Sequence, residues 1–173
     1  MTWTTWAALA AASSVCLLPP VLGLEMRQVL PTNLAVRAAE TAVKECEKQG
    51  QSVTATVIEP NGLVIAVIRN SKAGPHTVEN SYNKAYTVSS FGRISRLQST
   101  RALIEGIKGA RGIGTFPLPA DPLTGLSYSI GGLAINSKKE LIGAIGVSGS
   151  PNGNIDESCA AMGLEAIKPE LDA

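Results

Sequence analysis

The sequence predicts an α+β fold in which helices cover an antiparallel sheet. Two β-branched stretches, Ser52–Ile58 and Leu63–Arg69, are joined by Glu59-Pro60-Asn61-Gly62, which places Pro and Gly where a turn needs them. A second pair of stretches, Ser127–Asn136 and Glu140–Val147, is separated by a short polar turn. Helical patterns stand before, between and after these pairs. Because hairpin connections make neighbouring strands antiparallel, we expect a sheet built from two hairpins and covered by helices.

The first and last predicted helices each carry an apolar stripe. Thr32 is the expected N-cap of the first helix, which ends near Gln49. The last helix opens with a capping box formed by Asn154 and Glu157, and Pro169 is expected to end it. The stripe residues are Ala35, Ala39, Ala42, Val43 and Cys46 in the first helix and Ile155, Cys159, Met162, Ala166 and Ile167 in the last.

Two further helices are expected between the hairpins. The first of them starts with Thr77 as N-cap and runs through Ser90. A weaker helix opens at Ser99 or Thr100 and ends near Gly109. The stretch that follows, residues 112–126, contains three Pro and three Gly and is expected to be a loop.

The first 24 residues carry no charged side chain, whereas all 15 Lys/Arg and 14 Asp/Glu residues follow them. The apolar run at the N-terminus is too short to span a bilayer and is followed by Pro19-Pro20. Val21 and Gly23 suit the subsites of a signal peptidase, so residues 1–23 are predicted to be a signal peptide. The alternatives are an uncleaved interfacial anchor or an apolar helix packed on the body. Residues 24–173 are predicted to form one domain, secreted or periplasmic.

Composition argues against several classes of partner. The net charge is +1 and the sequence pI about 7.7, which does not favour a nucleic-acid or anionic-membrane surface. Aromatic residues make up 4 % of the chain, too few for base-stacking platforms. We therefore expect no nucleic-acid partner and no stable membrane insertion after signal cleavage.

Two cysteines remain after the expected cleavage, which removes Cys16. Cys46 and Cys159 lie on the apolar faces of the first and last predicted helices. An even pair in an oxidising compartment favours a disulfide bond. The alternative is two buried free thiols that act as small hydrophobic residues.

Several catalytic motifs fail on inspection. Gly146-Val147-Ser148-Gly149-Ser150 resembles a nucleophile elbow, but its last position is Ser and no helix follows directly. One His and two pairable Cys cannot assemble a zinc site in one chain. The Gly-rich strand Gly143-Ala144-Ile145-Gly146 instead predicts the close approach of another element or chain.

His76 is the only histidine and lies directly before a predicted helix, where a loop can present it. It could be a hydrogen-bonded surface or capping residue. It could also be an axial haem ligand, because the porphyrin supplies the other four nitrogens. Helical spacing places Asn80, Asn83, Lys84 and Thr87 along the face that continues from His76.

The basic and phenolic side chains near this helix have two interpretations each. Lys84 could keep its ammonium in water, or it could contact an anion such as a carboxylate or a haem propionate. Three arginines could be propionate partners or a solvated basic face: Arg93, Arg96 and Arg101. Tyr82 and Tyr86 could be phenolate ligands or packing residues.

Three stretches together resemble the HbpS/GlcG family of haem-binding proteins, to which haem degradation is also attributed. The first is Gly74-Pro75-His76-Thr77, followed by Asn83-Lys84-Ala85-Tyr86-Thr87. The second joins Gly131-Gly132-Leu133-Ala134-Ile135 to the strand Ile142–Gly149, and the third is Asp156-Glu157-Ser158-Cys159-Ala160. The resemblance covers about Leu34 to Ile167.

The resemblance implies a profilin-like fold, haem (heme) binding and homo-oligomers that are extracytoplasmic in some members. On this basis the first hypothesis is a secreted haem-binding protein for capture, storage, redox sensing or degradation of haem. His76 would be its iron ligand, and Lys84, Thr87 and Asn80 would belong to the cofactor site. The second hypothesis is a haem-free enzyme that acts on an organic acid, with His76 as acid–base and Lys84 as anion anchor. The third is an oligomer with only a structural role.

Overall fold

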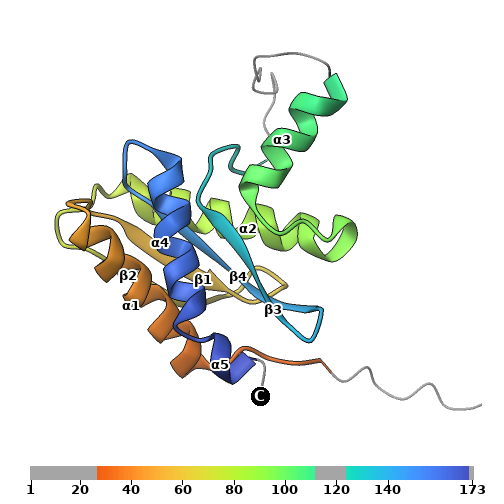
Figure 1. Cartoon of the computed structure of the whole chain (residues 1–173), viewed down its shortest axis with the longest axis horizontal. Coiled ribbons are helices and arrows are strands. Elements are labelled where there is room, and N and C mark those ends of the chain that lie inside the picture. The colour runs from red at the N-terminus through yellow and green to blue at the C-terminus, as the bar shows by residue number, and fades with distance from the viewer. Residues whose placement is uncertain (1–26, 112–123, 172–173) are drawn as a thin grey trace, which may run out of the picture.

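The computed structural model describes residues 27–111 and 124–171 and contains a four-stranded antiparallel sheet (Figure 1). The strand order is β2-β1-β4-β3. The strands are β1 (Thr54–Ile58), β2 (Val64–Arg69), β3 (Gly132–Ser137) and β4 (Glu140–Ser148). The predicted α+β class with two hairpins is therefore confirmed.

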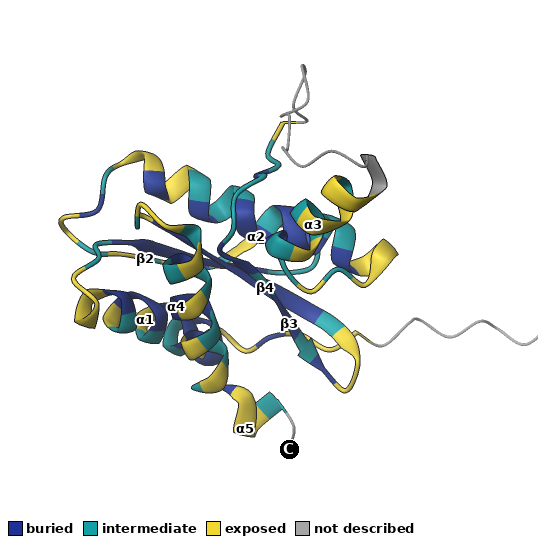
Figure 2. Ribbon diagram, turned by 45° about the horizontal axis from the view of Figure 1, so that its top comes forward, coloured by how far each residue is buried: buried dark blue, intermediate teal, exposed yellow. Residues whose placement is uncertain are grey.

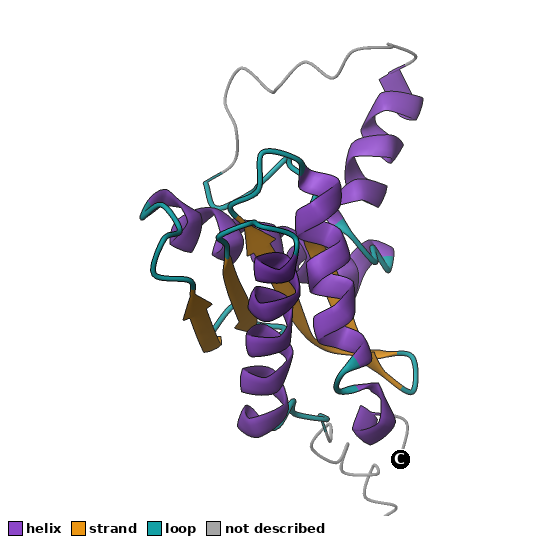
Figure 3. Ribbon diagram, turned by 60° about the vertical axis from the view of Figure 1, so that its left-hand side comes forward, coloured by secondary structure: helices purple, strands orange, loops and turns teal. Residues whose placement is uncertain are grey.

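Helices cover both faces of this sheet, as Figure 3 shows from the side. One face carries α1 (Thr32–Lys48) and α4 (Gly153–Glu165), and the short α5 (Lys168–Leu171) follows α4. The other face carries α2 (His76–Ser95), and α3 (Thr100–Arg111) extends away from the sheet beside it. The sheet is thus the middle layer of three.

The central strands are buried on both faces (Figure 2). Along β1, Thr54 and Thr56 point to α2, whereas Ala55 and Val57 belong to the apolar core under α1 and α4. Ala55 pairs with Val147 of β4 in the antiparallel register. Strand alternation therefore gives each face of the sheet its own set of side chains.

The core under α1 and α4 is made of small and branched apolar residues, and Cys46 of α1 is bonded to Cys159 of α4 within it. Their Cα atoms lie 5.5 Å apart across a sequence separation of 113 residues. The structure thus contains the predicted disulfide.

Two helices start earlier than predicted, α1 by one residue and α2 by two. Pro31 occupies the N-cap position of α1, so Thr32 is already helical. Pro75 occupies that of α2, and Thr77 lies in the first turn, where its Oγ1 donates to the Gly74 carbonyl oxygen. Pro at a helix start sacrifices no backbone hydrogen bond, because the first amides of a helix have no partner within it.

Helix α2 also continues beyond the predicted end at Ser90, to Ser95. Near this predicted end a polar residue, Ser89, falls on the apolar stripe of the helix. In the structure Ser89 is buried, and its hydroxyl donates to the carbonyl oxygen of Pro60. Because of this bond, burial of Ser89 leaves no unpaired hydroxyl group, and the helix can continue past it.

The last helix begins with a different cap from the expected one. Asn152 is the N-cap of α4, and its side chain accepts a hydrogen bond from the Asn154 amide. Glu157 is not part of a capping box, because it pairs with Arg101 of α3. Pro169 does not end α4, which stops at Glu165. It lies instead inside α5.

The predicted signal peptide, residues 1–23, lies outside the described residues, as does most of the expected loop 112–126. Within the described part of the chain, no helix has both the length and the apolar character needed to cross a membrane.

Candidate functional site

His76 is the first residue of α2, and its side chain is exposed. The imidazole lies directly against Gly74: a Cβ added there would stand 2.7 Å from Cε1 and 2.9 Å from Nδ1 of His76. Any larger residue at this position would therefore displace the ring. No hydrogen bond or ion pair joins the imidazole to another of the described residues, so a ring nitrogen is available to a metal or a proton.

Asn80 lies one turn further along α2 and connects the helix to two other segments. Its Nδ2 donates to the Oγ of Ser148 at the end of β4, over 2.9 Å. Its Oδ1 accepts from the Oγ of Ser127 over 3.2 Å, and Ser127 also shares a hydrogen bond with Ser129. Both ends of the amide are engaged within the protein.

Thr87, two turns further along α2, also binds the segment that contains Ser127. Its buried Oγ1 donates to the Asn83 carbonyl oxygen and accepts from the Ser127 amide, each over 2.7 Å. These bonds explain why the predicted strand over Ser127–Asn136 starts only at Gly132. The backbone of Ser127 bonds to a side chain of α2 instead of to a neighbouring strand.

Lys84 is buried, with 2 % of its surface exposed. Its Nζ donates to Asp156 Oδ2 and to the Val147 carbonyl oxygen, both over 2.8 Å. Of the two interpretations of Lys84, an ammonium in water and a contact with an anion, the structure shows the second, and the anion is a carboxylate of the chain itself. Burial lowers the pKa of Lys84, and the charge and hydrogen bond of Asp156 offset part of that effect.

Asp156 is the partner that the sequence did not assign to Lys84. It lies in the first turn of α4 and is itself buried, and its second oxygen accepts from the Ser150 amide over 3.1 Å. Two charges in a dry environment need such complete bonding to be tolerated. The only sequence signal was the acidic start of the last helix.

The four residues assigned to the cofactor site thus share one helix but not one surface. His76 faces solvent at the N-terminal end of α2. Further along the helix, Asn80 is half-buried, and Lys84 and Thr87 are buried. An exposed imidazole can bind a metal or transfer a proton. A buried ion pair can position a helix, but it offers no free charge to a ligand.

The other candidate residues make their contacts in separate parts of the structure. Arg101 donates from Nε to Glu157 over 2.7 Å and also bonds Asn154, so it holds α3 to α4. Tyr82 and Tyr86 stack with ring centroids 5.7 Å apart. The Tyr82 hydroxyl donates to the Gly62 carbonyl oxygen, which favours the packing interpretation.

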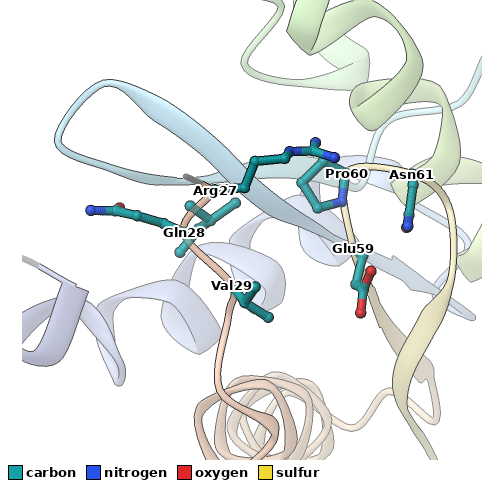
Figure 4. Close-up of a pocket in the computed structure, with 7 residues that line it drawn as sticks. Arg27, Gln28, Val29, Glu59, Pro60 and Asn61 are labelled. Carbon is teal, nitrogen blue, oxygen red and sulfur yellow. The ribbon is translucent and has the colours of Figure 1, made fainter. Parts of the chain in front are cut away.

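A small pocket lies between the segment before α1 and the β1–β2 turn (Figure 4). Arg27, Val29 and Pro60 are among its lining residues. Its volume is about 110 Å³, below the roughly 300–1,000 Å³ of typical cofactor sites. His76 is not part of its lining.

Comparison with protein-family models assigns the chain to a family. The family model described as "Haem degrading protein HbpS-like" matches residues 30–165. The chain belongs to the HbpS-like family. No curated protein sequence matches it significantly.

Solved structures of HbpS share the fold of this HbpS-like chain. The crystal structure of HbpS is 28 % identical, with a TM-score of 0.69 over 83 % of this chain and 94 % of that one. A double mutant of HbpS from Streptomyces reticuli is 26 % identical, with a TM-score of 0.69 over 95 % and 99 %. A complex of PduOC with haem, 19 % identical with a TM-score of 0.60 over 81 % and 96 %, shows the same fold.

Among the described residues of this HbpS-like chain, no group of three or more His, Cys, Asp or Glu side chains could hold a metal ion. A metal at His76 would therefore need most of its ligands from another source. A porphyrin is such a source, since it brings four nitrogen ligands of its own.

Proposed function

We propose that this protein binds haem and that His76 is the axial ligand of the iron. The observation that carries the proposal is the exposed imidazole of His76, which has no partner among the described residues, in a chain of a family described by haem degradation. One imidazole is sufficient for this ligation. Capture, storage or redox sensing of haem, with or without its degradation, are the roles we consider.

The residues around His76 fit an iron ligand at this end of α2. Gly74 leaves room for the ring and limits its orientation, because the ring lies on the glycine backbone. Bound haem would supply the oxygen or peroxide chemistry of its iron. The chain itself would supply the imidazole and the rigid helix that carries it.

Lys84, Asn80 and Thr87 would support this site by holding α2 and its neighbouring segment in place. Lys84 is paired with Asp156, so we propose that it holds α2 on the sheet and that an exposed cation meets the haem propionates. Lys72 is suited to that role, because it is exposed in the loop four residues before His76. Asn80 and Thr87 hold the segment around Ser127 against the same helix.

The haem-free enzyme loses support for a specific reason. That hypothesis needs Lys84 as an anion anchor, and its ammonium is buried with Asp156 as its anion. An organic acid would have to displace a carboxylate that also accepts from the Ser150 amide. We therefore favour haem.

We also propose that the protein is exported and forms homo-oligomers. The disulfide between Cys46 and Cys159 supports export, because disulfides persist in oxidising compartments. Because a haem iron has two axial positions, His76 of a second copy could take the other one. The haem content would then be one per two chains.

The test is an absorbance titration of the purified protein with hemin, compared with His76→Ala. We expect a saturable Soret shift that is lost in the variant and restored by added imidazole, which can occupy the vacated ligand position. The matched control is Glu79→Gln, an exposed change in the same turn of α2 that should leave the titration unchanged.

Each failure has a distinct meaning. Full binding by His76→Ala would overturn the ligand assignment. A wild-type titration identical to that of free hemin would overturn haem binding itself. Lys72→Gln should weaken binding only modestly, because an exposed ion pair contributes little.

A further inference from the structure

The C-terminal end of α2 borders a second pocket, far from His76. It lies between the end of the helix and the β3–β4 turn, with a volume of about 270 Å³. Its lining consists of Gly92, Arg96, Gln98, Asn136, Lys139 and Leu141. Because α2 has 20 residues, its two ends are about 30 Å apart. The pocket is thus separate from the proposed haem ligand.

Two of the lining residues are cations with no ion-pair partner among the described residues. Arg96 and Lys139 are both exposed, and neither forms a salt bridge there. None of the acidic residues that the structure describes lines the pocket. Both cationic residues therefore border the same open volume, and none of the described acidic residues forms an ion pair with them.

The amide side chains of the pocket are fixed by each other. Gln98 Nε2 donates to the Arg96 carbonyl oxygen over 2.8 Å, and Asn136 Nδ2 donates to Gln98 Oε1 over 2.7 Å. This chain of bonds connects the end of α2 to β3 and holds the backbone of Arg96 in place. Leu141 adds an apolar part to the lining.

Both cations occupy backbone positions that usually favour another residue. Arg96 ends α2 with a φ of 54°, where Gly is the common choice. Lys139 has a φ of 77° in a two-residue turn, where Asn-Gly is common. The described residues contain one further non-glycine with positive φ, Lys138, in the same turn. Residues held in such conformations tend to cluster at functional sites.

We propose that this pocket binds a small, doubly charged oxyanion, with phosphate as its simplest form. The planar guanidinium of Arg96 can donate to two oxygens at once, and the Lys139 ammonium can donate to a third. The helix C-terminus carries partial negative charge, so both cations are required. Because the site is open, binding is expected to weaken with salt.

The test measures binding of inorganic phosphate to the full chain by calorimetry at low ionic strength. The variants are Arg96→Asn and Lys139→Asn, since Asn tolerates a positive φ better than either cation and the fold should be retained or stabilised. We expect each variant to bind phosphate at least about tenfold more weakly, which corresponds to about 1.4 kcal/mol. Thermal unfolding of both variants checks that the fold is retained.

Lys138→Asn is the matched control. It changes the same charge in the same turn at another positive φ, but Lys138 does not line the pocket. Its phosphate affinity should equal that of the wild type. An equal loss in Lys138→Asn would show a general charge effect and overturn the proposal, as would the absence of saturable binding by the wild type.

Two further measurements define the site. Tighter binding of O-phosphoserine than of inorganic phosphate would indicate a phosphate carried on a larger molecule, and the reverse order would indicate free phosphate. His76→Ala should bind phosphate normally, whatever its effect on hemin. Loss of phosphate binding in that variant would overturn the assignment of a separate site.

Discussion

The two faces of the sheet hold their helices by different means. Under α1 and α4 the contacts are apolar and a disulfide joins the two helices. Under α2 the apolar cluster is small, and hydroxyl groups and an ion pair make the central contacts. Apolar contact tolerates small displacements, whereas hydrogen bonds fix distance and direction. The face that carries His76 is thus held in large part by directional polar bonds.

Close packing exists on both faces, but its atoms differ. Between α1 and α4, a Cβ at Gly163 would stand 2.5 Å from the Ala38 carbonyl oxygen. Under α2, a Cβ at Gly146 would stand 2.0 Å from the Ser81 carbonyl oxygen. The second contact brings a helix backbone against a strand, as the Gly-rich sequence of β4 predicted. It also brings Ser81 within 2.7 Å of Thr56, hydroxyl to hydroxyl.

Removal of the disulfide should have the largest effect on stability. In the chain-entropy model a cross-link over about 100 residues contributes roughly 4.7 kcal/mol, and this one spans 113. We expect Cys46→Ala/Cys159→Ala to lower the free energy of unfolding by about 4 to 5 kcal/mol in urea titrations followed by circular dichroism. A reductant should destabilise the wild type and leave the double variant unchanged. An intact wild-type mass that does not change on reduction would contradict the bond.

Separation of the buried ion pair should cost nearly as much on the other face. Lys84→Met leaves the Asp156 carboxylate buried without its partner, which typically costs about 3 to 5 kcal/mol. Lys84→Met/Asp156→Asn should recover most of this loss, because Asn retains an acceptor for the Ser150 amide. Chemical denaturation of both single variants and the double variant gives the coupling energy. Additive losses would show that the pair does not act as a unit.

The same contrast explains what the sequence could predict. The strands, α1 and the disulfide follow from local periodicity and from a pair of cysteines on apolar stripes. The bond of Lys84 to Asp156 joins residues 72 positions apart, and no local pattern specifies it. Ser127 is part of a stretch that resembles a strand, but Thr87 and Asn80 bind it from α2. Apolar layers can therefore be predicted from a single sequence, whereas polar partners that are far apart in the chain cannot.

Insertion of one methyl group between α2 and β4 should come next in magnitude. Gly146→Ala forces the helix backbone away from the strand, and we expect a loss of about 3 kcal/mol, at the upper end for overpacking. The matched control is Gly106→Ala in α3, where a Cβ meets nothing within 4 Å. That change should stabilise by about 0.5 to 1 kcal/mol, because Ala favours a helix interior over Gly. Equal effects in urea unfolding would contradict the close approach.

The smallest expected effects come from neighbouring residues of β1 that point to opposite faces. Val57→Thr places a hydroxyl in the apolar core and should cost about 2 kcal/mol. Thr56→Val removes one bond, but Ser81 still donates to the Val78 carbonyl oxygen, so the expected loss is about 1 kcal/mol. Urea unfolding of the two nearly isosteric exchanges measures the difference. If Thr56→Val were the more costly exchange, the hydroxyl pair of Thr56 and Ser81 would contribute to stability as well as to positioning. The polar face would then be a principal source of stability.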